Sequence, residues 1–233
     1  MSKNPAYRIL SRLVDIRPEE TSSALLMFFY FFLIQSSAYI IEPVKISLYL
    51  RWLRADRLPF AYLLSAILIG FVVTLNSKLL QSLKRYLYVS LSLVFFILNL
   101  VLFWFFFKLN WPWLSLLYWF WSDLFMVTSV TQFWILINDI YHPRQARRLV
   151  GFLVSGGLLG GVAGSLLASR LAQTVGTENL LLLCPLMLVF CLAILQRISK
   201  LSPGEKKEEV KERAELRRPS ARSVGILSLI KNS

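Results

Sequence analysis

Six long runs of apolar residues, nearly free of charged side chains, dominate this sequence. A helix needs about 20 such residues to cross the hydrocarbon core of a bilayer. Helices are expected because lipid offers exposed backbone groups no hydrogen-bond partner, and the runs do not alternate as barrel strands do. The sequence therefore predicts an all-α integral membrane protein with six transmembrane helices, over Thr21–Ile41, Leu58–Ser77, Tyr86–Phe107, Leu109–Asn138, Leu149–Ser169 and Asn179–Gln196.

The strong positive charge fits the same interpretation. The chain has a formal net charge of +13, and 20 of its 26 Lys and Arg residues lie in the two terminal segments, the second connection and the fourth connection. Basic residues concentrate on the cytoplasmic side of membrane proteins. We therefore expect a multi-pass protein with both termini in the cytoplasm, with membrane lipid rather than nucleic acid as the partner of its basic residues.

Composition divides the chain into three parts. Residues 1–20 resemble a short cytoplasmic interfacial helix, because apolar residues share one face and arginines border it. Residues 21–198 form the predicted six-helix transmembrane bundle. Residues 199–233 begin as a basic cytoplasmic linker and end in a new apolar stretch, which is either the start of a second half or an amphipathic tail on the membrane.

The motifs of common enzymes and metal sites are missing from the sequence. It contains no Walker A signature, no His-Glu-x-x-His and no nucleophile elbow. We therefore expect no enzyme activity, no catalytic residue, no cofactor and no metal. Cys184 and Cys191 lie about 10 Å apart on a helix, too far for a disulfide, and are interpreted as packing residues. The small residues at every fourth position from Gly156 to Ser165 predict close helix packing, or a smooth face that slides during transport.

Three charged residues fall where charge is expensive. Asp123 lies inside the fourth apolar run, and Glu42 and Lys45 follow the first, which continues as an apolar stretch to Leu50. A charge at mid-bilayer costs about 2.5–3.5 kcal/mol on insertion scales. Glu42 and Lys45 form either a local pair at i,i+3 spacing or part of a pathway for a charged substrate. Asp123 is either neutralised by a neighbouring helix or lines that pathway with Lys45. Tyr39 and Asn138 are added as candidate binding residues with hydrogen-bonding groups.

Several motifs resemble those of the ATP/ADP translocase family, the nucleotide transporters of plastids and obligate intracellular bacteria. Ile41-Glu42-Pro43-Val44-Lys45 resembles the end of that family's first helix. The fourth span is the better match, with Trp121-Ser122-Asp123, Gln132-Phe133-Trp134, Asn138-Asp139 and Gln145-Ala146-Arg147-Arg148, and the glycine run follows it. The resemblance covers roughly residues 20–200.

This resemblance implies a major-facilitator-like architecture, in which two six-helix halves enclose a central cavity and the chain forms the N-terminal half. It implies nucleotide exchange across a bacterial inner membrane or an organelle envelope, with Lys45 and Asp123 at the positions of the family's functional lysine and acid. The anionic nucleotide is then the substrate, and a second half or a second copy of the chain is the partner. Asp123 stands where the family usually has Glu, and Glu42 stands at a position that is often basic.

Three functions therefore compete on the sequence. The first is secondary active transport of a nucleotide, with Lys45 attracting the phosphate and pairing with Asp123 in the empty state. The second is a facilitator-type transporter of another solute, proton-coupled through Asp123. The third is a truncated, non-transporting membrane protein, since the last apolar stretch stops at Ser233.

Overall fold

The computed structural model describes residues 20–82, 85–109, 111–176 and 179–201. Within these ranges every element is a helix, which confirms the all-helical prediction: α2 (Thr21–Trp52), η1 (Ala55–Arg57), α3 (Leu58–Ser82), α4 (Arg85–Phe107), α5 (Pro112–Ile140), α6 (Pro143–Val175), η2 (Asn179–Leu182) and α7 (Leu183–Leu201). The chain divides into two compact units, Met1–Arg197 and Ile198–Ser233. The fold below is that of the first unit. Residues 1–19 of the interfacial helix predicted for 1–20, and residues 202–233 of the linker predicted for 199–233, lie outside the described residues.

Six of the described helices are long and apolar enough to cross a membrane. They correspond to the six predicted windows, and they indicate a multi-pass membrane protein. The first helix continues through the apolar stretch after Ile41 and ends at Trp52, so Glu42 and Lys45 lie inside it.

Prolines lie within the first three residues of four of these helices and in the interior of one. Pro112 and Pro143 each stand at the first position of a helix. A backbone N–H there has no acceptor within the helix, so its absence in proline costs no hydrogen bond. His142 caps α6, and its backbone N–H donates to Oε1 of Gln145 at 2.9 Å. Pro43 differs because it lies inside α2 and donates no hydrogen bond to the carbonyl of Tyr39 one turn earlier.

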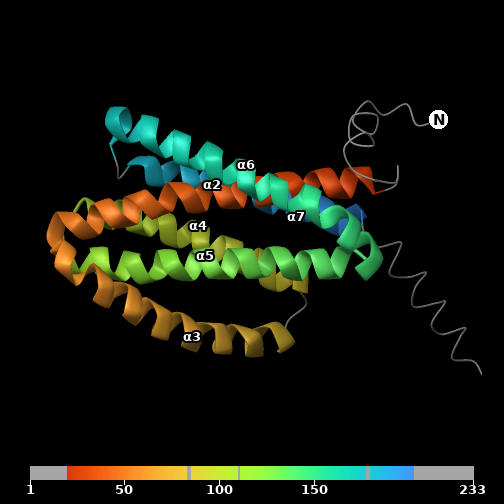
Figure 1. Ribbon diagram of the computed structural model, residues 1–233, viewed down its shortest axis with the longest axis horizontal. Helices are drawn as coiled ribbons and strands as arrows, with labels where there is room; N and C mark the ends of the chain where they lie inside the picture. The colour runs from red at the N-terminus through yellow and green to blue at the C-terminus, as the bar shows by residue number, and fades with distance from the viewer. Residues whose placement is uncertain (1–19, 83–84, 110, 177–178, 202–233) are drawn as a thin grey trace, which may run out of the picture. The chain divides into compact units, whose positions relative to one another are not determined.

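Helix α2 is the centre of the unit, and its longest contact is with α6 (Figure 1). The contact is close because the glycines of α6 lie directly against the backbone of α2. A β-carbon at Gly156 would lie 2.6 Å from the carbonyl oxygen of Phe28, and β-carbons at Gly160 and Gly164 would lie closer still to carbonyl oxygens of α2. Ser36 Oγ donates to the carbonyl oxygen of Gly160 at 2.9 Å. The predicted packing role of these small residues is confirmed.

Helix α7 also packs on α2. The thiols of Cys184 and Cys191 are free and fully buried, and they donate to the carbonyl oxygens of Ser37 and Tyr30 at 3.8 and 3.7 Å. The prediction that the two cysteines are packing residues, with no disulfide between them, is confirmed.

A second face of α2 meets α5 through side chains. The rings of Phe31 and Phe133 stack with centroids 3.7 Å apart, and Tyr49 packs on Trp119 at 4.8 Å. The two helices are antiparallel, because Tyr49 comes after Phe31 on α2 while its partner Trp119 comes before Phe133 on α5. Helix α3 packs on α5 near its start and diverges from it toward Ser82 (Figure 1).

We expect Gly160→Ala to destabilise the protein, because the added methyl group would push against the α2 backbone. Overpacking of this kind costs about 1–3 kcal/mol. Thermal unfolding of the purified protein in detergent measures the change. Gly151→Ala on the same helix is the matched control, because nothing lies within 4 Å of a β-carbon there, and alanine is the better helix former. Equal melting temperatures for the two variants would contradict this packing.

Candidate functional site: a buried charge cluster between α2 and α5

Lys45 lies in the interior of the bundle and bridges two carboxylates. Its side chain is 1% exposed, and Nζ lies 2.7 Å from Oε1 of Glu42 and 2.8 Å from Oδ1 of Asp123. The local i,i+3 pair of Glu42 and Lys45 is therefore present, and Lys45 also neutralises Asp123 from the neighbouring helix. The substrate pathway stays a prediction. We call Lys45, Glu42 and Asp123 the Lys45 cluster.

The antiparallel contact of α2 with α5 brings these groups together. Glu42 and Lys45 share one face of α2 because residues three apart are neighbours on a helix surface. On α5, Trp119 lies one turn before Asp123, and it packs on Tyr49, one turn after Lys45. The aromatic contact therefore sets the height at which Asp123 faces Lys45.

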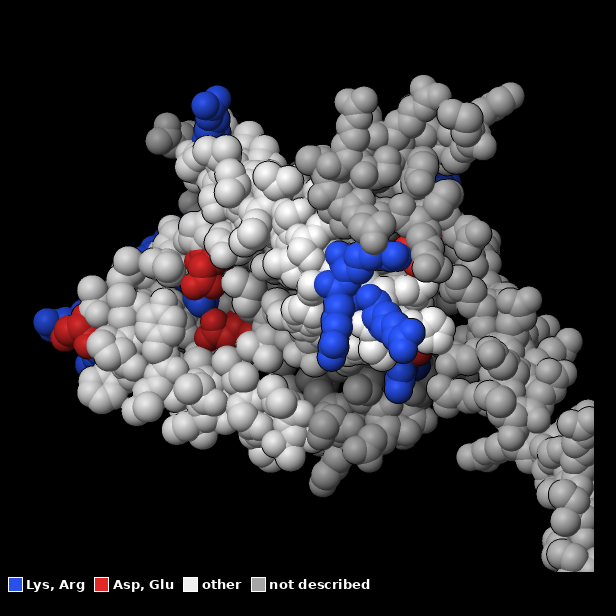
Figure 2. Space-filling view, turned by 45° about the vertical axis from the view of Figure 1, so that its right-hand side comes forward, with Lys and Arg blue, Asp and Glu red and all other residues white. Residues whose placement is uncertain are grey.

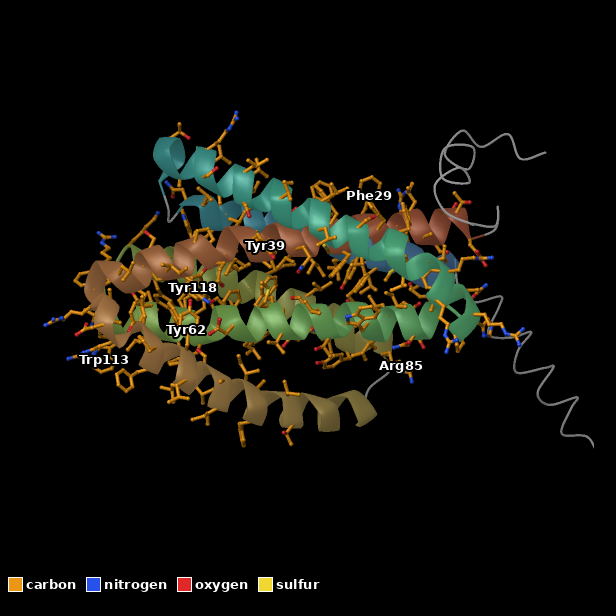
Figure 3. The ribbon with its side chains drawn as sticks, in the orientation of Figure 1. Phe29, Tyr39, Tyr62, Arg85, Trp113 and Tyr118 are labelled. Carbon is orange, nitrogen blue, oxygen red and sulfur yellow. The ribbon has the colours of Figure 1, made fainter. Side chains whose placement is uncertain are left out.

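Two aromatic rings lie close to the ammonium group of Lys45. Nζ lies 4.6 Å from the ring centroid of Trp119 and 5.7 Å from that of Tyr62, within the range of cation–π attraction. The indole N–H of Trp119 donates to Oγ of Ser65 at 3.0 Å, and both residues are buried. This hydrogen bond to α3 fixes the orientation of the indole face presented to the ammonium group. Figure 3 shows Tyr62 at the end of the unit away from Arg85.

The cluster contains more negative than positive charge. Two carboxylates share one ammonium, which leaves a formal charge of −1. The second oxygen of Asp123, Oδ2, is buried and has no hydrogen-bond partner among the described residues, and the same holds for the hydroxyl of Tyr118. Glu42 and Asp123 are 36% and 15% exposed, so the carboxylates form the accessible side of the cluster while Lys45 lies behind them.

Charge is otherwise concentrated near helix ends. Glu20 binds Arg148, and Oε1 of Glu20 accepts from Nε2 of Gln145 at 2.8 Å, while Arg85 pairs with Asp139 at 3.1 Å. These pairs join α2 to α6 and α4 to α5 at the end that the distribution of basic residues predicts to be cytoplasmic. Figure 2 shows the contrast on one face, where groups of charged side chains are separated by wide uncharged surface.

Of the two remaining candidate residues, Tyr39 lies one turn before Glu42 on α2 with its ring against α6, and Asn138 lies far from the cluster along α5. Tyr39 is 42% exposed and lines a groove of about 490 Å³ between α2 and α6, together with Phe31 and Gln35. Asn138 is exposed on α5, 15 residues beyond Asp123 and therefore about 22 Å from it along the helix axis. The structure brings Lys45, Glu42 and Asp123 together, and it does not bring Asn138 to them.

Sequence reasoning missed the aromatic part of the site. Trp119 stands four residues before Asp123, a spacing that places both on one face of α5. That spacing was visible in the sequence, but tryptophans are frequent in this chain, so nothing singled out this one. Among the described residues, no three His, Cys, Asp or Glu side chains gather as a metal site would require.

No family model, curated protein or solved structure matches the chain. The resemblance to nucleotide translocases therefore stays a prediction, and the functional argument depends on the residues and geometry described above.

A double-mutant cycle tests the pairing across the two helices. Removing one partner of a buried ion pair costs about 3–5 kcal/mol because it leaves the other charge uncompensated. We expect Lys45→Met and Asp123→Asn each to lower the free energy of unfolding, and the double variant to lose less than the sum of the two. Denaturant unfolding in detergent measures these values.

The matched control is the pair Arg54–Asp56, whose side chains are 82% and 60% exposed at an N–O distance of 3.4 Å. Exposed pairs contribute about 0.2–1 kcal/mol. If Lys45 and Asp123 were coupled no more strongly than Arg54 and Asp56, the buried pair would have no special energetic role.

Proposed function

We propose that the chain is a secondary active transporter of major-facilitator-like architecture, and that the Lys45 cluster lies on its substrate path. The proposed substrate is an anionic solute, with an ATP/ADP-type nucleotide as the leading choice. The single observation that carries the proposal is the placement of Lys45, an amine 1% exposed in a membrane-crossing helix and held between two carboxylates of two helices.

Structural stability alone is a weak reason for this arrangement. Well-packed apolar residues generally serve a helix bundle as well as a buried ion pair or better. Ionisable residues inside membrane segments are rare, and they mark substrate or ion paths. The cluster also has an exposed side, formed by Glu42 and Asp123, and in the proposed transporter this side faces the aqueous cavity.

The cluster supports a simple exchange of partners. In the empty state Lys45 pairs with Glu42 and Asp123, so no bare ammonium lies in the apolar bundle. An arriving phosphate offers charge-assisted hydrogen bonds that compete with the two carboxylates for the same ammonium. When the anion leaves, the carboxylates take Lys45 back. The ion pair is therefore the resting state of the binding group and lowers the energy of the transporter without its substrate.

The choice of helices is consistent with this architecture. The first and fourth membrane-crossing helices, α2 and α5, supply the cluster. In major-facilitator halves these two helices face the central cavity, as the resemblance implies. The partner that would close the cavity is a second six-helix half or a second copy of the chain. The nucleotide itself is proposed from the resemblance, and the charge of Lys45 supports an anion of any kind.

Uptake of labelled ATP or ADP in cells expressing the native gene tests this function. We expect Lys45→Ala to reduce apparent affinity by roughly 10- to 100-fold, because one hydrogen bond to a charged group is worth about 1.5–3 kcal/mol. The matched control is Lys108→Ala. Lys108 also lies over a tryptophan ring, 4.0 Å from the centroid of Trp104, but it is exposed at the end of α4.

The control should leave uptake unchanged. Absence of uptake by the wild type would remove the nucleotide as substrate, and uptake that is insensitive to Lys45→Ala would remove the cluster from the path.

A further inference from the structure

We infer that Glu42, Asp123, Trp119 and Tyr62 form a binding site for a monovalent cation, which the ammonium group of Lys45 occupies in this structure. When Lys45 turns to an anionic substrate, an external cation, either a metal ion such as Na⁺ or a proton, takes its place. The replacement of Lys45 by an external cation rests on the proposed function, because it requires Lys45 to leave. The existence of the cation site does not depend on that function.

Each group around the ammonium attracts positive charge. Two carboxylate oxygens lie 2.7 and 2.8 Å from Nζ, and two aromatic ring faces lie 4.6 and 5.7 Å from it. The indole is held in this orientation by its hydrogen bond to Ser65. A carboxylate pair backed by oriented aromatic faces is the chemistry of a cation site, and Lys45 supplies the cation from within the chain.

The charge of the site requires a replacement when Lys45 moves away. With the ammonium present the formal charge is −1, and without it two carboxylates carry −2. Both oxygens touch the same nitrogen, so they lie within 5.5 Å of each other. Like charges at this separation repel each other, and a cation or a proton between them removes the repulsion.

The observations favour one positive charge over two. The ammonium that fills the site in this structure brings a single positive charge. Here the described residues offer two carboxylates, and no third His, Cys, Asp or Glu gathers with them. Three phenols also lie nearby. Tyr118 on α5 is buried with no hydrogen-bond partner for its hydroxyl among the described residues, Tyr62 on α3 lies over the ammonium, and Tyr49 on α2 packs on Trp119. The uncompensated Oδ2 of Asp123 is a ready acceptor for a proton or a ligand for a small metal ion.

The consequence is coupling between an anion and a cation. Binding of the anion draws Lys45 out of the site, and binding of the cation stabilises the carboxylates that Lys45 leaves behind. Each ligand then raises the affinity for the other, as linkage requires. A cation gradient would in this way contribute to accumulation of the anion.

The direct test removes the internal cation. Thermal unfolding of purified Lys45→Met is compared with that of the wild type in NaCl and in N-methyl-D-glucamine chloride at equal ionic strength, at about pH 8 and about pH 5. We expect Na⁺ or acid to raise the melting temperature of Lys45→Met by about 3 °C or more. The wild type should not respond in this way, since its ammonium fills the site.

Controls separate this effect from general salt and pH effects. Lys108→Met should behave like the wild type, and adding Glu42→Gln and Asp123→Asn to Lys45→Met should abolish the response. A response to Na⁺ at about pH 8 identifies a metal cation, and a response to acid in both salts identifies a proton. If neither Na⁺ nor acid raises the melting temperature of Lys45→Met, the inference is overturned.

Two further measurements guard against a variant that does not fold. Lys45→Gln replaces the amine by a neutral amide and is tested in the same way. Binding of ATP to the wild type is also measured in both salts at both values of pH, where we expect affinity to rise with the cation. A cation response without ATP transport would leave the cation site standing and remove the nucleotide. ATP transport without any cation response would keep the nucleotide as substrate and overturn the cation site.

Discussion

The ion pair between Lys45 and its two carboxylates is the interaction on which the rest of the site depends. An ammonium group in an apolar bundle needs negative partners, and it obtains them from its own helix and from α5. The aromatic contacts between Tyr49, Trp119 and Tyr62 set the height and orientation of those partners. Because removing the ammonium leaves two carboxylates without a counter-charge, Lys45 can leave them only when another positive charge replaces it.

Helix α2 meets its two main neighbours by different means. Against α6 the backbone of α2 packs on glycines. Because these glycines have no β-carbon, carbonyl oxygens of α2 can lie directly against them. Against α5 the contact is made by long side chains, the Phe31–Phe133 stack, the ion pair and Tyr49 on Trp119. Interlocked backbones resist displacement, whereas rings and flexible charged side chains can adopt other rotamers. The contact of α2 with α5 is therefore easier to rearrange, as the proposed transport would require.

The sequence predicted the helices and the three charges of the site, and it did so for different reasons. The runs of apolar residues sufficed for six helices, because membrane thickness fixes the length of a span. Lys45, Glu42 and Asp123 stood out because charge is rare in such runs. The sequence could not show that one ammonium serves both acids, which depends on the height of α5 against α2. Asn138 was selected for its chemistry alone, and distance along α5 separates it from the cluster.

Pro43 gives α2 a bending point beside the cluster. The carbonyl of Tyr39 receives no hydrogen bond from position 43, because proline has no backbone N–H. The helix therefore bends more easily at this turn than elsewhere. The glycine contact with α6 holds the part of α2 before this point, from Phe28 to Ser36, and Lys45 lies in the part after it. The part of α2 after Pro43 can therefore change direction and carry Lys45 with it, while the part before Pro43 stays packed on α6.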